Sequence, residues 1–384
     1  MNSYVPNYLK YKNTMTVFRL IQDQQTVSRG ELVRITGMSF PTVLKTVNRL
    51  LDLKIIAELE EMEPVRGAGR RGHLLRFQPG ALYALGIEFE GQLLNMGMVD
   101  LNGACHHRQS VFLPDSLDIN EIENCIMKET ETLMKLARQK HWEVVGIGIS
   151  LPGVVNQKEN KILLRKAFHI TAPTSVEEAF PRLTREIALP VFLGNDVNFA
   201  CRGESFLRRC SPDYQDFLFV SLGSGLGASF FLNGAIWEGC SFQAGEIGRF
   251  LLTPPDKLLS SPPTYIENMI NIEALSSRFH LNFSGTLNLD SQQKEVVCSY
   301  LCPYLSHLFI NLFNLLDIRR CILTGIIPSV LGEELINQLT GLIGTYITDN
   351  EFTIEPSVSS DTGIIGAAVS VFDRILPVLF TEIK

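Results

Sequence analysis

Residues 194–232 carry the pattern that decides the fold, running from Gly194-Asn-Asp-Val-Asn198 to Leu222-Gly-Ser-Gly-Leu-Gly227 and beyond. A buried-strand pattern at Asp216–Val220 leads into the glycine cluster, and a second apolar run follows at Gly227–Leu232. Glycines at a strand end let backbone amides converge on an anion, although short glycine runs also form ordinary tight turns. The stretch therefore predicts two strands joined by a glycine turn.

The same alternation of strands and helices extends across residues 81–384. Strand patterns precede a helical pattern, a buried strand follows it, and a similar order returns later in the chain. The segments are Ala81–Phe89, Leu93–Leu101, Gln109–Leu113, the helix Ile119–Gln139, Val144–Ser150, and then Asp216–Val220, Gly227–Leu232 and Arg320–Thr324 ahead of another helix. This order predicts an α/β fold with two similar lobes, each a sheet covered by helices.

Residues 1–80 have a different, mostly helical pattern. Helical spacing over Asn13–Gln24 is followed by the capping box Ser28-Arg-Gly-Glu31 and by Gly37, which suits the left-handed turn between two helices. Ser39 is the expected N-cap of a third helix, from Phe40 to about Leu53. This punctuation predicts a helix-turn-helix.

The third helix and the segment after it supply candidate DNA contacts. Strand patterns at 55–59 and 73–77 flank a Gly/Arg-rich tip, and together they predict a wing. The candidate contacts are polar or basic side chains expected to point outward: Ser39, Thr42, Lys45, Thr46 and Arg49 on the helix, and Arg66, Arg70 and Arg71 on the wing. A solvated amphipathic helix and a flexible basic linker are the alternatives.

Charge is distributed unevenly between these two regions. The net charge of the 384 residues is −7. Residues 1–80 contain 12 of the 34 basic residues and 7 of the 41 acidic ones, whereas residues 81–384 contain 22 basic and 34 acidic residues. A basic head on an acidic body suits DNA binding at one end only.

The start of the chain lacks the apolar core of a secretion signal, and we expect a cytoplasmic protein that does not cross a membrane. The eight cysteines form no CxxC pair and are expected to be buried free thiols.

Several motifs in order resemble the ROK family of repressors, open reading frames and sugar kinases. They are Ser150-Leu-Pro-Gly153, Gly194–Asn198 with Glu204, Leu222–Gly227, and Ala244-Gly-Glu-Ile-Gly248, while the head resembles the family's repressor branch. The resemblance implies a winged helix-turn-helix at 1–80 and a bilobal actin-like (ribonuclease-H-like) sugar-kinase fold at 81–384. It also implies a ligand site made of Gly153, Asn195, Asp196, Glu246, Arg249 and Glu267.

Two departures from the family pattern predict lost functions. Glu88-Phe-Glu-Gly-Gln92 stands where family kinases have Asp-x-Gly-Gly-Thr, so that a carboxylate at Glu90 repels phosphate and no hydroxyl is present at Gln92. We therefore expect no kinase activity, although Asp196 matches the family's catalytic base; an active sugar kinase is the alternative. Residues 250–266 contain no Cys or His where relatives bind zinc, and we expect no metal and no cofactor.

Arg249 replaces the histidine of the family motif. Its fixed charge either selects an acidic or phosphorylated sugar or pairs with Glu246 or Glu267. The function expected is a sugar-responsive DNA-binding repressor, acting as a homodimer or homotetramer on operator DNA. A regulator that answers to a partner protein instead of a sugar is a further alternative. The residues identify neither the sugar nor the operator.

Overall fold

The computed structural model describes residues 4–59, 74–113, 118–164, 170–257, 260, 262–281, 289–347 and 352–381. Two compact units divide the chain. One comprises residues 1–150, 174–193 and 367–384, and the other comprises residues 151–173 and 194–366.

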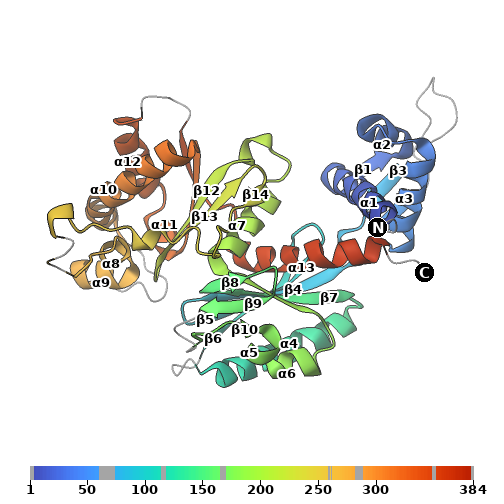
Figure 1. The fold of residues 1–384 in the computed structure, drawn as a ribbon, viewed down its shortest axis with the longest axis horizontal. Helices are drawn as coiled ribbons and strands as arrows, with labels where there is room; N and C mark the ends of the chain where they lie inside the picture. The colour runs from blue at the N-terminus through green and yellow to red at the C-terminus, as the bar shows by residue number, and fades with distance from the viewer. Residues whose placement is uncertain are drawn as a thin grey trace. The chain divides into compact units, whose positions relative to one another are not determined.

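The first unit contains a five-stranded sheet in the order β11-β7-β4-β5-β6. Three consecutive strands form an antiparallel meander, and the next strand pairs in parallel with the first of them. The strands are β4 (Tyr83–Glu90), β5 (Leu93–Asp100), β6 (Cys105–Phe112), β7 (Val144–Leu151) and β11 (Val191–Asn195). Figure 1 shows one face covered by α4 (Ile119–Gln139), α5 (Val176–Ala179) and α6 (Pro181–Glu186), and the opposite face by α13 (Thr362–Thr381).

The second unit repeats this strand order in its sheet β14-β13-β12-β15-β16. Its strands are β12 (Phe217–Leu222), β13 (Leu226–Leu232), β14 (Ala235–Ile236), β15 (Arg320–Thr324) and β16 (Thr353–Pro356). Again a meander of three strands is followed by parallel pairing to its first strand. A short antiparallel pair, β8 (Val154–Asn156) and β9 (Lys161–Leu164), also belongs to this unit. The predicted α/β fold with two similar lobes is therefore confirmed.

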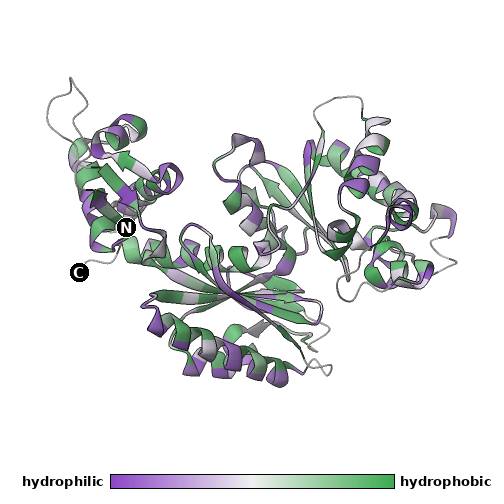
Figure 2. Ribbon diagram, turned by 180° about the vertical axis from the view of Figure 1, so that it is seen from behind, coloured by the Kyte–Doolittle hydropathy of each residue, from purple (hydrophilic) through white to green (hydrophobic). Residues whose placement is uncertain are grey.

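Both faces of the second sheet are buried. Along β12, Leu218, Val220 and Leu222 join a large core with the helices of one side, whereas Phe217 and Phe219 join a second core with α7 (Asp196–Leu207). The helices of the large core include α10 (Ser291–Leu316), α11 (Ile326–Leu331) and α12 (Glu333–Gly344), and the short helices α8 (Glu267–Ile270) and α9 (Ile272–Phe279) also contribute buried residues to it. Figure 2 shows hydrophobic residues along the strands and hydrophilic ones on the outer helix faces, as this packing requires.

The head consists of three helices and a small sheet in the order β1-β3-β2. Its elements are α1 (Tyr4–Gln24), β1 (Thr26–Ser28), α2 (Arg29–Thr36), α3 (Phe40–Asp52), β2 (Ile56–Leu59) and β3 (Leu74–Phe77). The Ser28–Glu31 capping box, the left-handed Gly37 and the Ser39 N-cap are all present as predicted. Amide and hydroxyl donation from Ser28 lowers the pKa of Glu31. Strand β1 was not predicted. The helices followed by the β2–β3 hairpin have the order of a winged helix-turn-helix.

The head packs against the C-terminal helix and the first sheet, within one unit. The rings of Phe18 on α1 and Phe380 on α13 meet at 5.7 Å, and Gln22 Nε2 donates to the Leu101 carbonyl at 2.6 Å. The sequence boundary at residue 80 therefore separates two patterns, while the folded head and first lobe share a compact unit.

Among the described residues, α10 and α13 are long and apolar enough, by length and composition alone, to cross a membrane. More than half of the apolar stretch in each is buried inside the protein, as in core helices.

The cysteines match their prediction only in part, because Cys201, Cys298, Cys302 and Cys321 are buried but Cys210 and Cys240 are exposed. Burial raises the pKa of the Cys201 thiol to about 12.

Candidate functional site

Asn195 and Asp196 lie where β11 ends and α7 begins. Asn195 is the N-cap of α7, because its Oδ1 accepts from the Asn198 amide at 3.0 Å. Its Nδ2 donates to the Gly153 carbonyl at 3.0 Å and to Asp196 Oδ1 at 2.9 Å. The capping role is thus real, and the same amide also holds the predicted residues Gly153 and Asp196 together.

Three consecutive residues of β13 contact the segments that carry three of the predicted sugar-site residues, Asp196, Glu246 and Glu267. The Leu226 amide donates to Glu267 Oε2 at 2.9 Å, and the Ala228 amide donates to the Gly245 carbonyl, next to Glu246, at 2.9 Å. Between them, a Cβ at Gly227 would lie 2.9 Å from Cγ2 of Val197, next to Asp196. The start of β13 therefore positions Asp196, Glu246 and Glu267 in one region of the second lobe.

Glycines keep this region compact. A Cβ at Gly225 would lie 3.0 Å from Glu267 Oε2, and one at Gly248 would lie 2.7 Å from the same oxygen. Gly245 has φ +93°, and a Cβ there would lie 1.8 Å from the Ala228 carbonyl oxygen. Larger residues at these places would push the carboxylate or the strand away.

Arg249 forms an ion pair with Glu246, with Nε and Oε2 3.3 Å apart. The two side chains are 55% and 42% exposed, so the pair is accessible to solvent. Glu267 is instead held by the Leu226 amide. Of the two pairings expected for Arg249, the structure contains the one with Glu246.

The β4–β5 turn carries the residues that the family resemblance places at the phosphate loop of kinases. Glu90 ends β4 and pairs in register with Leu93, leaving Gly91 and Gln92 as the turn. Its carboxylate accepts from Nδ2 of the buried Asn95 at 3.0 Å, and Asn95 Oδ1 accepts from Ser110 Oγ at 2.6 Å. Glu90 is therefore anchored at the strand end, and Glu88 lies two residues before it on the same strand.

On α3, the structure corrects two of the five predicted DNA contacts. Thr46 is only 6% exposed, since it lies with Val43 and Val47 on the inward stripe of the helix. The Arg49 guanidinium donates to the Leu379 carbonyl of α13 and is half-buried. Both predictions of an outward side chain were wrong: Thr46 follows the helical spacing of the buried stripe, whereas Arg49 is held by α13, which local spacing does not reveal.

The other three predicted α3 residues remain available or cap the helix. Lys45 is exposed, while Ser39 and Thr42 contact each other through their hydroxyl oxygens at 2.8 Å. Arg66, Arg70 and Arg71 lie outside the described residues, although the strands that flank them pair as expected, from Ile56↔Phe77 to Leu59↔Leu74. Their contacts with DNA stay a prediction.

No group of three His, Cys, Asp or Glu side chains suited to a metal occurs in the described part of the chain. The segment that carries zinc ligands in relatives offers the Arg249–Glu246 pair instead, and a guanidinium does not ligate zinc. The residues therefore do not fit the family's zinc, and the absence of any cofactor stays a prediction.

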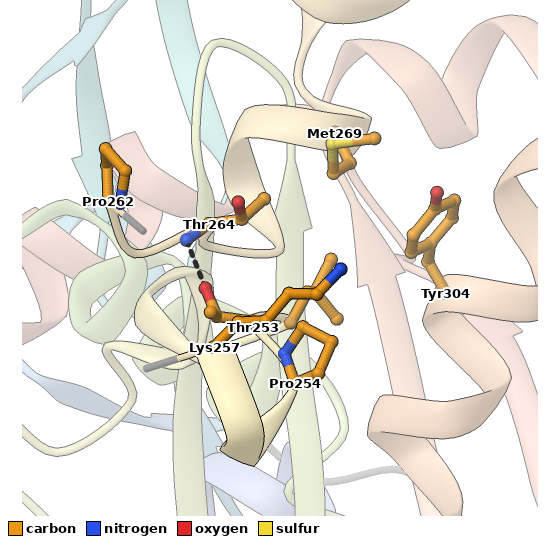
Figure 3. A pocket seen from close by; sticks show the side chains of 8 residues that line it. Thr253, Pro254, Lys257, Pro262, Thr264, Met269 and Tyr304 are labelled. Atoms are coloured by element: carbon orange, nitrogen blue, oxygen red, sulfur yellow. Dashed lines mark hydrogen bonds between the residues drawn. The ribbon is translucent and has the colours of Figure 1, made fainter. Parts of the chain in front are cut away.

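Two features were missed in the sequence. A cavity of about 520 Å³ opens beside α8, and Figure 3 shows Thr253, Lys257, Thr264 and Tyr304 among its lining residues. None of the six predicted sugar-site residues lines it. No motif marked this cavity.

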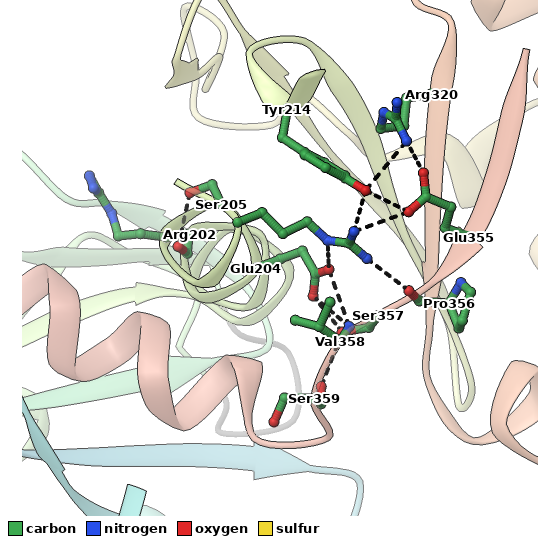
Figure 4. Close-up of polar contacts among 11 residues, drawn as sticks. Arg202, Glu204, Ser205, Tyr214, Arg320, Glu355, Pro356, Ser357, Val358 and Ser359 are labelled. Carbon is green, nitrogen blue, oxygen red and sulfur yellow. Dashed lines mark hydrogen bonds and ion pairs between the residues drawn. The ribbon is translucent and has the colours of Figure 1, made fainter. Parts of the chain in front are cut away.

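The second missed feature is the role of Glu204, which is fully buried on α7. Glu204 accepts from Arg208 Nε at 2.6 Å and from Ser357 Oγ at 2.6 Å (Figure 4). Arg208 and Tyr214 both donate to Glu355, at 3.0 and 2.7 Å. Glu204 therefore ties the helix that begins at Asp196 to the segment ahead of α13.

The chain is similar in sequence and in fold to known proteins. The ROK family profile matches residues 84–374. The xylose repressor of Bacillus subtilis is 22% identical over 97% of this chain and 98% of its own length. A ROK family transcriptional regulator, a homologue of the Escherichia coli MLC protein, has a similar fold with a TM-score of 0.75 at 18% identity, covering 97% of this chain and 99% of that one. A ROK glucokinase of Streptomyces griseus, solved with glucose and AMPPNP, covers 75% of this chain and 98% of that one, at 18% identity and a TM-score of 0.58.

The glucokinase matches only part of the chain, whereas the regulators match it almost from end to end. The shared fold, the ordered motifs around β13 and the match over residues 84–374 show that the chain belongs to the ROK family.

Proposed function

We propose that this protein is a transcriptional repressor whose ROK body binds a sugar or sugar derivative without phosphorylating it. The observation that carries the proposal is the grouping of Asp196, Glu246 and Glu267 around the start of β13, in a chain that also has a helix-turn-helix head. Carboxylates accept hydrogen bonds from sugar hydroxyls, and Asn195 offers both donor and acceptor. The end-to-end similarity to a xylose repressor supports the same function.

A sensor role without catalysis is supported by the β4–β5 turn. Phosphoryl transfer depends on positioning a charged triphosphate and its metal. Here the anchored Glu90 carboxylate repels phosphate, and Gln92 provides no hydroxyl. Asp196 then serves sugar binding rather than proton abstraction.

The Arg249–Glu246 pair supports a neutral sugar as the effector. Because the guanidinium already has a carboxylate partner, an anionic sugar would have to displace that carboxylate.

We propose that the protein works in the cytoplasm as a homodimer or homotetramer, because two symmetric heads are the usual way to read an operator.

α13 offers a route from the sugar site to the head. A Cβ at Gly366 would lie 1.6 Å from the Phe199 carbonyl oxygen, so α13 and α7 are in backbone contact. At its other end, α13 accepts the Arg49 guanidinium and packs Phe380 on Phe18. A sugar that binds one arrangement of α7 better than another thereby shifts the arrangement of α3.

The test combines DNA and sugar binding by the full chain. A duplex selected from a random-sequence pool is bound by the protein, and a panel of neutral sugars and sugar phosphates is added while DNA binding is followed by fluorescence anisotropy. We expect at least one sugar to change DNA affinity. Failure to select any duplex, or indifference to the whole panel, would contradict the proposal.

The kinase alternative keeps one observation in its favour, the retained Asp196, whose neighbour Val197 approaches Gly227 just after the glycine turn. Incubation with ATP, magnesium and the same sugars distinguishes the two functions. Sugar-dependent release of ADP would establish the kinase.

A further inference from the structure

The outward surface of α3 is mostly apolar over its first two turns. Phe40 and Leu44, one turn apart, are 54% and 37% exposed, and Pro41 between them is also exposed. The inward stripe of the same helix is complete without them, since Val43, Val47 and Leu50 are fully buried. Phe40 and Leu44 therefore lie outside the fully buried stripe of α3, with part of each side chain open to solvent.

The polar groups on this surface are fewer than the sequence indicated. The hydroxyls of Ser39 and Thr42 contact each other, Thr46 is buried, and Arg49 is held by α13. Lys45 and Asn48 are exposed polar side chains in the middle of α3, and Asp52 is exposed in its last turn. Hydrogen bonds from this helix to base edges are correspondingly limited.

We propose that Phe40 and Leu44 recognise the 5-methyl groups of thymines in the major groove of the operator. The inference rests on the proposed function, since it assumes that α3 enters DNA. The thymine methyl is the apolar group that a major groove presents, and aromatic and aliphatic side chains contact it. Lys45, on the same surface, and the basic excess of residues 1–80 favour DNA as the occupant over a second copy of the chain.

The DNA sequence preferred by one head then contains thymines opposite the first two turns of α3, where Phe40 and Leu44 contact their methyl groups. Lys45 contributes attraction to the phosphates, which does not depend on the base sequence. Substitution at Phe40 or Leu44 thus relaxes the thymine preference, whereas substitution at Lys45 weakens binding to all sequences alike.

The experiment replaces single thymines by deoxyuridine, which removes only the methyl group. A duplex selected by the full-length protein from a random-sequence pool is substituted one thymine at a time, and affinities are measured at fixed salt by anisotropy. Each contacted methyl should account for about a fourfold loss of affinity, the equivalent of ~0.8 kcal/mol for one buried CH₂-sized group.

Leu44→Ala and Phe40→Ala should each bind more weakly and lose the response to uracil at particular positions. Ile35→Ala is the matched control, because Ile35 is an exposed apolar residue of α2, 43% exposed, and it should keep the full response. Circular dichroism checks that the exposed substitutions leave the head folded.

The outcomes separate this inference from the proposed function. If no duplex is selected, the proposed function fails. If a duplex is bound but no uracil substitution changes the affinity, DNA binding stands and methyl recognition is overturned. A smaller oligomer for Phe40→Ala and Leu44→Ala, with no uracil response in the parent, would assign the surface to a second copy instead.

Discussion

The β4–β5 turn of the first lobe and the β12–β13 turn of the second occupy the same place in sheets of the same strand order. They differ in the residues that stand at the strand end. In the second lobe, Gly225 leaves room for Glu267 and Gly227 leaves room for Val197 to approach the strand. In the first lobe, Glu90 fills the strand end with an anchored carboxylate. The comparison teaches that the same place in the two sheets carries close-packed glycines in one lobe and a carboxylate in the other, and we propose that this carboxylate repels phosphate.

The largest expected effect contrasts one glycine beside each turn. Gly245→Ala should lower the free energy of unfolding by more than ~3 kcal/mol, because its positive φ and its contact with the Ala228 carbonyl both oppose a side chain. Gly91→Ala should cost about 1 kcal/mol, because its φ is +59° but its surroundings are open. Urea denaturation measures both. Equal losses would show that the two turns are equally constrained.

The next effect concerns sugar affinity. Glu267→Gln keeps an oxygen that can accept from the Leu226 amide, so the fold should persist, but it removes the charge that strengthens hydrogen bonds from sugar hydroxyls. We expect about tenfold weaker binding of the effector, measured by calorimetry. Glu273→Gln, an exposed glutamate on α9, is the control and should bind normally. Unchanged affinity for Glu267→Gln would remove this residue from the site.

Much of this comparison could be predicted from the sequence. Hydrophobic alternation found the central strands of both sheets but not β11, β14 or β16, and the ends of α4 and β15 were predicted to the residue. The outward positions on α3 were less accurate, because burial of Arg49 depends on α13, which lies 330 residues away in the chain. The pairing of Glu204 with the segment before α13 was equally hidden, since no local pattern encodes a contact across 153 residues.

A third change removes the negative charge at the first turn. Glu90→Gly combined with Gln92→Thr removes the repulsion and restores a hydroxyl, and we expect weak but measurable binding of magnesium and a nucleotide where the parent has none. Gln92→Thr alone keeps the carboxylate and should show no binding. If the single variant binds as well as the double, the hydroxyl and not the charge is decisive.

The smallest effect is expected at the exposed ion pair. Arg249→Ala should change the free energy of unfolding by less than ~1 kcal/mol, because a half-exposed pair is screened by solvent. Thermal denaturation with and without the effector checks this. Complete loss of effector binding by this variant would indicate that Arg249 contacts an anionic sugar directly, contrary to the neutral effector proposed.

The most direct measurement of the central claim is calorimetric titration of the full-length protein with magnesium and AMPPNP, in the presence and absence of its effector sugar. We predict heat from the sugar and none from the nucleotide. Saturable nucleotide binding would contradict the claim that the Glu90 carboxylate excludes a nucleotide from the first-lobe turn.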